Sequence, residues 1–85
     1  MSKTFRFVGF STHRGAVAVR YANDKGRARV LERNGHTDIF MLDAGEDLHP
    51  MDLVDLLLTR AEAGEFDTPA VEAIGAEARR LGFVI

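Results

Sequence analysis

The sequence predicts a small α+β domain that spans residues 1–85. Two stretches near the N-terminus alternate in hydropathy with the period of two that is typical of strands. Two later stretches, which begin near Pro50 and Thr68, repeat apolar residues at the spacing of an amphipathic helix. Strands followed by helices are typical of the α+β class, and 85 residues have room for a single domain.

The first two strands form a predicted β-hairpin. In residues 4–10, Phe5 and Phe7 point to one face, and residues 16–21 alternate in the same way. The polar residues 11–15 between them have the length of a hairpin connection. We therefore expect these two strands to pair with each other.

Residues 24–34 fit two structures, and their pattern leaves both open. As a helix, the segment would have its N-cap at Asn23 or Asp24 and would end at Gly35 in a left-handed conformation. As strands, it would turn at residues 23–26 and again at Asn34-Gly35. The predicted sheet has three strands in the first case and four in the second.

The C-terminal half supplies one more strand and two helices that pack on the sheet. Residues 38–43 are apolar on both faces, as in a central strand, and residues 44–47 form a predicted polar link. A helix is expected from Pro50 to about Ala63, and a second from its N-cap Thr68 to Gly82. The last three residues dock on the core or add a short strand. The expected inward stripes are Met51, Val54, Leu57, Leu58 and Ala61, widened by Leu53 and Leu56, in the first helix, and Val71, Ile74, Ala78 and Leu81 in the second.

Composition excludes several classes of protein. The chain has no cysteine, which excludes disulfides, thiolate metal sites and cysteine nucleophiles. It has no apolar stretch long enough for a transmembrane helix, and its first residues lack the apolar core of a signal peptide. We therefore expect a cytoplasmic protein without a membrane partner.

The net charge of −2 conceals a strong asymmetry along the chain. Residues 1–36 carry eight basic and two acidic side chains, whereas residues 37–85 carry three basic and eleven acidic ones. The basic part indicates an anionic partner, and the acidic part could imitate a phosphate backbone toward a basic groove in a protein that handles nucleic acid. The alternatives are that the two parts attract each other within the fold, and that the acidic helices are simply solvated. The candidate partner-binding residues are Arg20, Arg27, Arg29 and Arg33 on the basic side and Asp47, Asp52 and Asp55 on the acidic side.

The basic residues are expected to cluster whether residues 24–34 form a helix or strands. In a helix, Lys25, Arg29 and Arg33 fall on one stripe, and in a strand Arg27, Arg29 and Arg33 share one face. Arginine outnumbers lysine in this cluster, which suits bidentate contacts to phosphate or carboxylate groups.

The chemistry-bearing residues predict neither an enzyme nor a metal site. His36, Asp38 and His49 could together supply metal ligands, but they lack the spacing of a metal motif, and we expect structural or exposed histidines. Ser11 and His13 are separated by one residue in the sequence. A hydroxyl and a base so close together on one loop rarely adopt the geometry of nucleophilic catalysis. Gly9 and Gly15 are expected to bracket a turn, without the spacing of a phosphate-binding loop. We therefore predict no catalytic residue, no metal and no cofactor.

A family resemblance lies in three short motifs. Arg20-Tyr21-Ala22-Asn23-Asp24, Gly35-His36-Thr37-Asp38-Ile39 and the apolar helix after Pro50 resemble short uncharacterised proteins of bacteriophages and prophages, over about residues 5–58. The resemblance implies that residues 24–34 form a crossover helix between two strands. It implies no functional residues.

The expected function is that of a small non-enzymatic interaction protein, encoded by a phage or mobile element. It would bind a protein partner through a charged surface in the host cytoplasm and inhibit a host defence complex that handles nucleic acid. One alternative is direct binding of RNA or DNA through the basic face. Another is a virion component or homodimer with Leu53 or Leu56 at its seam.

Overall fold

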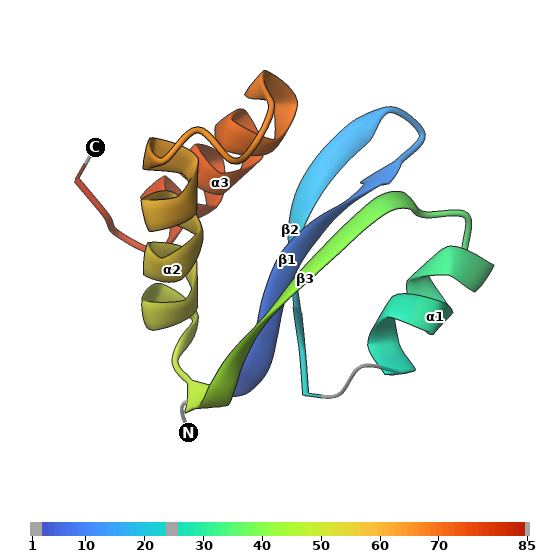
Figure 1. Ribbon diagram of the computed structural model, residues 1–85, viewed down its shortest axis with the longest axis horizontal. Coiled ribbons are helices and arrows are strands. Elements are labelled where there is room, and N and C mark those ends of the chain that lie inside the picture. Colours follow the sequence, from blue (N-terminus) through green and yellow to red (C-terminus); the bar gives the residue numbers. More distant parts are fainter. Residues whose placement is uncertain (1–2, 24–25, 85) are drawn as a thin grey trace.

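The computed structural model describes residues 3–23 and 26–84, with all side chains in these ranges except those of residues 26–28. Strands β1, β2 and β3 form one antiparallel sheet in the order β2-β1-β3. Helices α2 and α3 cover one face of the sheet, and α1 lies on the opposite side (Figure 1). The α+β prediction is confirmed. The elements are β1 (Phe5–His13), β2 (Ala16–Ala22), α1 (Gly26–Arg33), β3 (Thr37–Leu48), α2 (Pro50–Glu62) and α3 (Thr68–Arg80).

The predicted N-terminal hairpin is confirmed, with a tighter turn than expected. Residues 11–13 were predicted to belong to the connection, but they extend β1 and pair with residues 16–18 of β2. The turn is therefore made by Arg14 and Gly15 alone, with φ angles of 53° and 81°. Two consecutive positive φ angles are typical of a type I′ turn, whose twist matches that of the flanking strands.

The helical structure of residues 24–34 is confirmed in its described part, since α1 begins at Gly26. Residues 28–30 therefore do not pair with any strand, and β3 pairs with β1 instead. Of the two predicted N-cap residues, Asn23 lies in a bend before α1, and Asp24 lies outside the described residues.

Strand β3 is longer than the predicted 38–43, and the predicted polar link at residues 44–47 is wrong. Its predicted central place is wrong too, because β3 lies at the edge of the sheet and β1 at the centre. Phe7 pairs with Asp43 and Phe5 pairs with Leu48, so the three residues 5–7 of β1 face the six residues 43–48 of β3. The extra residues form a bulge that includes Gly45 at φ 83°. A bulge accommodates polar residues within a strand. For this reason, the alternation of apolar and polar residues did not predict that β3 continues through residues 44–47.

The main core lies between the sheet and helices α2 and α3. Val8, Leu53, Leu57 and Ile74 are fully buried there. The rings of Phe10, Phe40 and Phe66 close one end of this core, with centroid separations of 5.2–5.3 Å.

Both C-terminal helices are confirmed, but their inward stripes are rotated relative to the prediction. In α2, Met51 is exposed, whereas Leu53 is completely buried and so cannot form the seam of a homodimer. In α3, Val71 is exposed and Ala70 takes its place in the core. The N-cap of α3 is Asp67 and not Thr68, because the Asp67 carboxylate accepts a hydrogen bond from the Ala70 amide at 3.2 Å.

The chain after α3 forms no strand within the described residues. Phe83 is half-buried, Val84 is fully exposed, and Ile85 lies outside the described part. The described helices include none that is long and apolar enough to cross a membrane.

Candidate functional site

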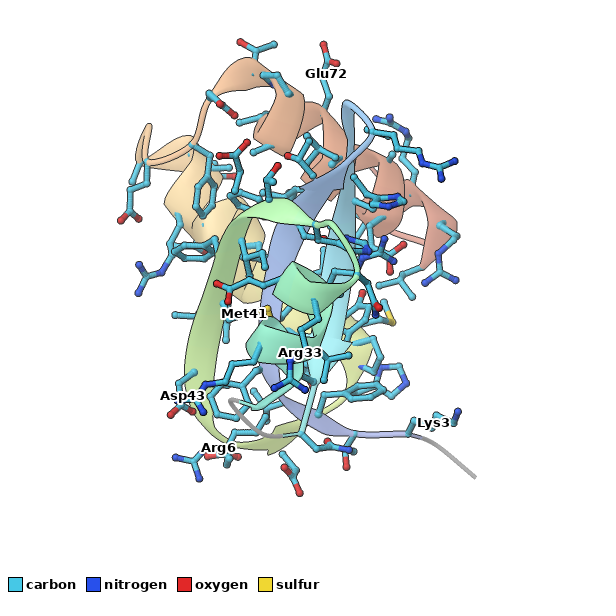
Figure 2. All side chains as sticks on the ribbon, turned by 90° about the vertical axis from the view of Figure 1, so that its right-hand side faces the viewer. Lys3, Arg6, Arg33, Met41, Asp43 and Glu72 are labelled. Carbon is cyan, nitrogen blue, oxygen red and sulfur yellow. The ribbon has the colours of Figure 1, made fainter. Side chains whose placement is uncertain are left out.

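Three of the basic residues lie on or beside α1, on the side of the sheet opposite α2 and α3 (Figure 1). Arg29 and Arg33 lie one turn apart on exposed positions of α1, and Arg20 lies half-buried on β2. Figure 2 looks at this side and shows Arg33 on the helix. We call Arg20, Arg29 and Arg33 the basic face. Arg27 also belongs to α1, but its side chain lies outside the described residues.

The three arginines of the basic face have no carboxylate partner in the described part of the chain. The ion pairs there join Arg6 to Asp43, Arg60 to Glu65 and Arg80 to Glu77. Of these, only the first links the basic part of the chain to the acidic part, at 2.8 Å. Among the described residues, attraction between the basic and acidic parts of the chain therefore does not neutralise the charges of the basic face.

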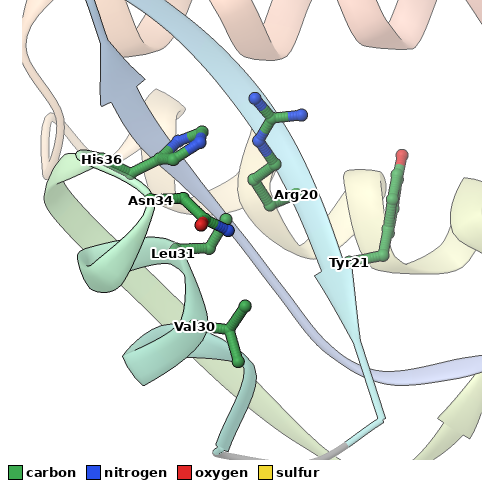
Figure 3. Close-up of a pocket in the computed structure, with 6 residues that line it drawn as sticks. All are labelled: Arg20, Tyr21, Val30, Leu31, Asn34 and His36. Atoms are coloured by element: carbon green, nitrogen blue, oxygen red, sulfur yellow. The ribbon is translucent and has the colours of Figure 1, made fainter.

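A pocket of about 310 Å³ opens between α1 and β2 (Figure 3). Its polar wall includes the guanidinium of Arg20, the amide of Asn34 and the imidazole of His36. Val30 and Leu31 line its apolar side. The remaining lining residue is Tyr21.

The end of α1 places His36 at this pocket. Gly35 adopts a φ of 84°, a conformation that is open to glycine without strain, as predicted for the residue that ends this helix. The amides of Gly35 and His36 donate hydrogen bonds to the carbonyls of Glu32 at 3.2 Å and Leu31 at 3.0 Å. These two bonds define a Schellman motif, which fixes the direction in which the chain leaves the helix.

Ser11 holds the polar groups of the pocket together from the sheet side. Its side chain is 1% exposed, so its hydroxyl must find partners inside the protein. Ser11 Oγ lies 3.0 Å from His36 Nδ1 and accepts a hydrogen bond from Arg20 Nε at 3.4 Å. We assign the Ser11 hydroxyl as the donor of this hydrogen bond and His36 Nδ1 as its acceptor. The neutral imidazole then carries its own proton on Nε2.

His13 packs on the other side of the His36 ring. The two imidazoles are stacked at 4.5 Å with an angle of 20° between their planes. Partial burial of the ring lowers the pKa of His36, and the positive charges of His13 and Arg20 lower it further. His36 therefore favours its neutral form in the folded protein.

We expect the free energy of unfolding to decrease as the pH falls below 6.5, the ordinary pKa of histidine. The folded-state pKa of His36 is lowered, so the unfolded chain binds this proton more readily. The stabilisation is present above 6.5 and is lost as the pH falls through the folded-state pKa. Urea denaturation from about pH 8 to about pH 5 should show a shallower pH dependence for His36→Gln than for the unchanged protein. Equal slopes would contradict the assignment to His36.

Sequence reasoning missed the pairing of Ser11 with His36. It compared Ser11 with its neighbour His13, whereas the hydrogen-bond partner is 25 residues away. One signal was present: with a period of two, Ser11 shares a strand face with Phe7 and Gly9, opposite the face of Val8. That signal predicts on which face of the strand Ser11 lies, but not which residue contacts Ser11 there.

Two of the three acidic candidates lie on the opposite side of the sheet from the basic face (Figure 1). Asp52 and Asp55 are exposed on α2, and Asp47 is exposed near the end of β3. The helix that carries two of them is on the opposite side of the sheet from α1 (Figure 1). The fold thus keeps Asp52 and Asp55 apart from the basic face.

The histidines do not assemble into a metal site in the described structure. His49 caps α2, since its Nδ1 accepts a hydrogen bond from the Met51 amide at 3.2 Å. No group of three or more metal-ligating side chains occurs among residues 3–23 and 26–84. Gly9 does not border a turn, because it lies in the middle of β1.

Tyr21 and Arg80 are engaged by Glu77, which joins β2 to α3. Tyr21 Oη donates to the Glu77 carboxylate at 2.6 Å, and Arg80 forms two bonds to it at 2.6 and 2.7 Å. The Arg80 hydrogen bond lowers the pKa of Glu77 despite partial burial, whereas burial and the Glu77 carboxylate raise the pKa of Tyr21. The single tyrosine hydroxyl of the chain is therefore committed to the fold.

Comparison of the chain with protein-family models, with curated proteins and with solved structures finds no match, so the functional argument rests on the geometry of the basic face and its pocket.

Proposed function

We propose that this protein works by binding an acidic protein partner through the basic face and not by catalysis. The observation that carries the proposal is that Arg20, Arg29 and Arg33 form no ion pair with a described carboxylate. Arg29 and Arg33 are exposed on a single helix, so a partner can reach both guanidinium groups at once. Guanidinium groups suit bidentate contacts to the carboxylates of such a partner.

The surroundings of the one hydroxyl–imidazole pair in the described structure support a non-catalytic role. Ser11 is 1% exposed, and its hydroxyl is held between Arg20 and His36. A nucleophile has to reach its substrate, whereas this buried hydroxyl is held by two neighbouring side chains.

A protein partner fits the surface better than a nucleic acid does. Proteins that bind single-stranded nucleic acid present aromatic rings on which bases stack. All seven aromatic residues of the chain are described, and none has an exposed side chain. The net charge of −2 also lacks the excess of positive charge that is typical of nucleic-acid-binding domains.

The identity of the partner is the most specific part of the proposal. The resemblance of residues 5–58 to bacteriophage and prophage proteins supports a partner from the host cell. We propose a host defence complex that handles nucleic acid, which would be blocked by this binding in the host cytoplasm.

Charge reversal on α1 tests the proposal. We expect Arg29→Glu combined with Arg33→Glu to weaken partner binding by at least about tenfold, because favourable contacts become like-charge repulsion. The matched control is Asp52→Lys combined with Asp55→Lys, which reverses two exposed charges on α2. The measurement is quantitative mass spectrometry of proteins captured from a nuclease-treated lysate, followed by affinity measurements on the purified partner.

Two results would overturn the proposal. In the first, the aspartate reversal abolishes capture and the arginine reversal does not, which would assign binding to the acidic side. In the second, a labelled oligonucleotide binds saturably at about 50 mM salt, weakens steeply at about 200 mM and is lost in the arginine variant. Circular dichroism of both variants verifies that they remain folded.

A further inference from the structure

We propose that the pocket between α1 and β2 binds a phosphate monoester, with the phosphoryl group at Arg20 and His36 and the organic group against Val30 and Leu31. The pocket, of about 310 Å³, has the size of a small-molecule site. This inference goes beyond the proposed function, because it concerns a small ligand and does not depend on Arg29 or Arg33.

The polar groups of the pocket can act together as hydrogen-bond donors. Arg20 uses Nε to bond Ser11, and its two terminal nitrogens have no partner among the described residues. The assigned tautomer of His36 presents an N–H at Nε2, which likewise has no described partner. The Asn34 amide, also without a described side-chain partner, adds a further donor. Such a set suits a ligand group that only accepts hydrogen bonds, and an ionised phosphoryl group does so with three oxygens.

These donors are held in place before any ligand arrives. Ser11 is buried and connects Arg20 to His36 through bonds of 3.4 Å and 3.0 Å. The ring of His36 is further restrained by its stack on His13 at 4.5 Å. Restraint of this kind favours binding because less side-chain freedom is lost when the ligand enters.

The electrostatic surroundings also favour an anion. Among the described residues that line the pocket, none is acidic. The described charges that act on His36 are those of His13 from β1 and Arg20 from β2. Its described neighbours in the pocket, Leu31 of α1 and Asn34 directly after this helix, are uncharged. Asp38 of β3 is exposed, two residues beyond His36. The carbonyls of Glu32 and Leu31 at the end of α1 accept backbone hydrogen bonds, which reduces their repulsion of an anion.

The apolar side of the pocket indicates an organic group and not a bare phosphate. Val30 is 45% exposed although it is a large apolar side chain, and it borders the pocket together with Leu31. A hydrocarbon group attached to the phosphate would remove this apolar surface from water. We therefore expect a monoester with a small apolar substituent to bind more tightly than inorganic phosphate.

Titrations with phenyl phosphate, inorganic phosphate and benzoate at constant ionic strength test the proposal. Two-dimensional NMR should show saturable shifts at His36, and phenyl phosphate should bind about tenfold more tightly than inorganic phosphate. Benzoate, which carries the same ring on a carboxylate, should bind more weakly than phenyl phosphate. Because an anion stabilises the protonated ring, binding should raise the pKa of His36, which NMR of the imidazole follows directly in the free and bound protein. The affinity itself depends on pH both through His36 and through the second ionisation of the phosphate, at about pH 6.

Variants distinguish this pocket from general attraction to positive charge. We expect Arg20→Met to weaken phenyl phosphate binding by at least about tenfold. The matched control Arg79→Met removes an exposed arginine on α3, which has no described ion pair, and should leave the affinity unchanged. His36→Gln should reduce the pH dependence of binding to that of the second ionisation of the phosphate, at about pH 6. This measurement is independent of whether Arg20→Met folds.

Three outcomes would overturn the proposal. They are shifts at His36 that do not saturate, benzoate binding as tightly as phenyl phosphate, and equal losses in the Arg20 and Arg79 variants. Failure here leaves the partner proposal standing, because that one is tested by Arg29→Glu with Arg33→Glu in the absence of any small ligand.

Discussion

Gly9→Ala is expected to unfold the domain. Gly9 lies in the middle of β1, the central strand of the sheet, where it pairs with Arg20 on one side and Met41 on the other. A Cβ atom at this position would overlap the backbone carbonyl of Phe40 and lie 2.9 Å from the Cα of Met41. Backbone atoms of a paired strand cannot move aside as a flexible side chain can, so relief requires separation of β1 from β3.

The expected loss exceeds the 1–3 kcal/mol of ordinary overpacking, at about 3 kcal/mol or more. A domain of this size has a total stability of only about 4–13 kcal/mol. Urea denaturation or a thermal melt should therefore show a large decrease in midpoint or no cooperative transition at all.

Gly75→Ala is the matched control for this prediction. Gly75 lies within α3, and the nearest heavy atom to an added Cβ is the flexible Arg79 Nη1 at 3.6 Å. Alanine is favoured over glycine in a helix by about 1 kcal/mol, so this variant should be as stable as the unchanged protein or more stable. An equal transition midpoint for Gly9→Ala and the unchanged protein would refute the close approach of β1 and β3.

Leu57→Ala is expected to destabilise the domain by about 2–5 kcal/mol. Leu57 is completely buried in the core that also contains Val8, Leu53 and Ile74. Removal of its side chain loses apolar burial and leaves a cavity between α2 and the elements it packs on. Because the domain has one such core, the loss should appear as a lower midpoint of a single transition.

The neighbouring residue provides the control. Leu56 is on the same helix and is 37% exposed, so Leu56→Ala should cost less than about 1 kcal/mol. Helix propensity and residue type are the same at both positions, and only burial differs. Similar losses at the two positions, measured by urea denaturation, would show that α2 is turned differently from the arrangement described here.

Local signals in the sequence were sufficient for the hairpin, the third strand and both C-terminal helices. Period-two alternation, Pro50 at a helix start and glycines after helix ends each act within a few residues, so they can be recognised without knowledge of the partner element. The rotation of the helices could not be predicted in the same way. Met51 and Leu53 are both apolar and lie near the edge of one stripe, and only the position of the sheet decides that Leu53 is the buried one.

For the charges too, the sequence predicted the local distribution but not the contacts between distant residues. The basic N-terminal part and the acidic C-terminal part follow from the order of the amino acids, because each charge belongs to its residue type. The packing of the elements, in contrast, pairs Arg6 with Asp43 and brings Arg20 to the Ser11–His36 pair, with no described carboxylate beside it. Ser11 and His36 are separated by 25 residues, and their contact depends on where α1 crosses the sheet. Contacts of that kind arise from the packing of whole elements, which no local pattern of residues encodes.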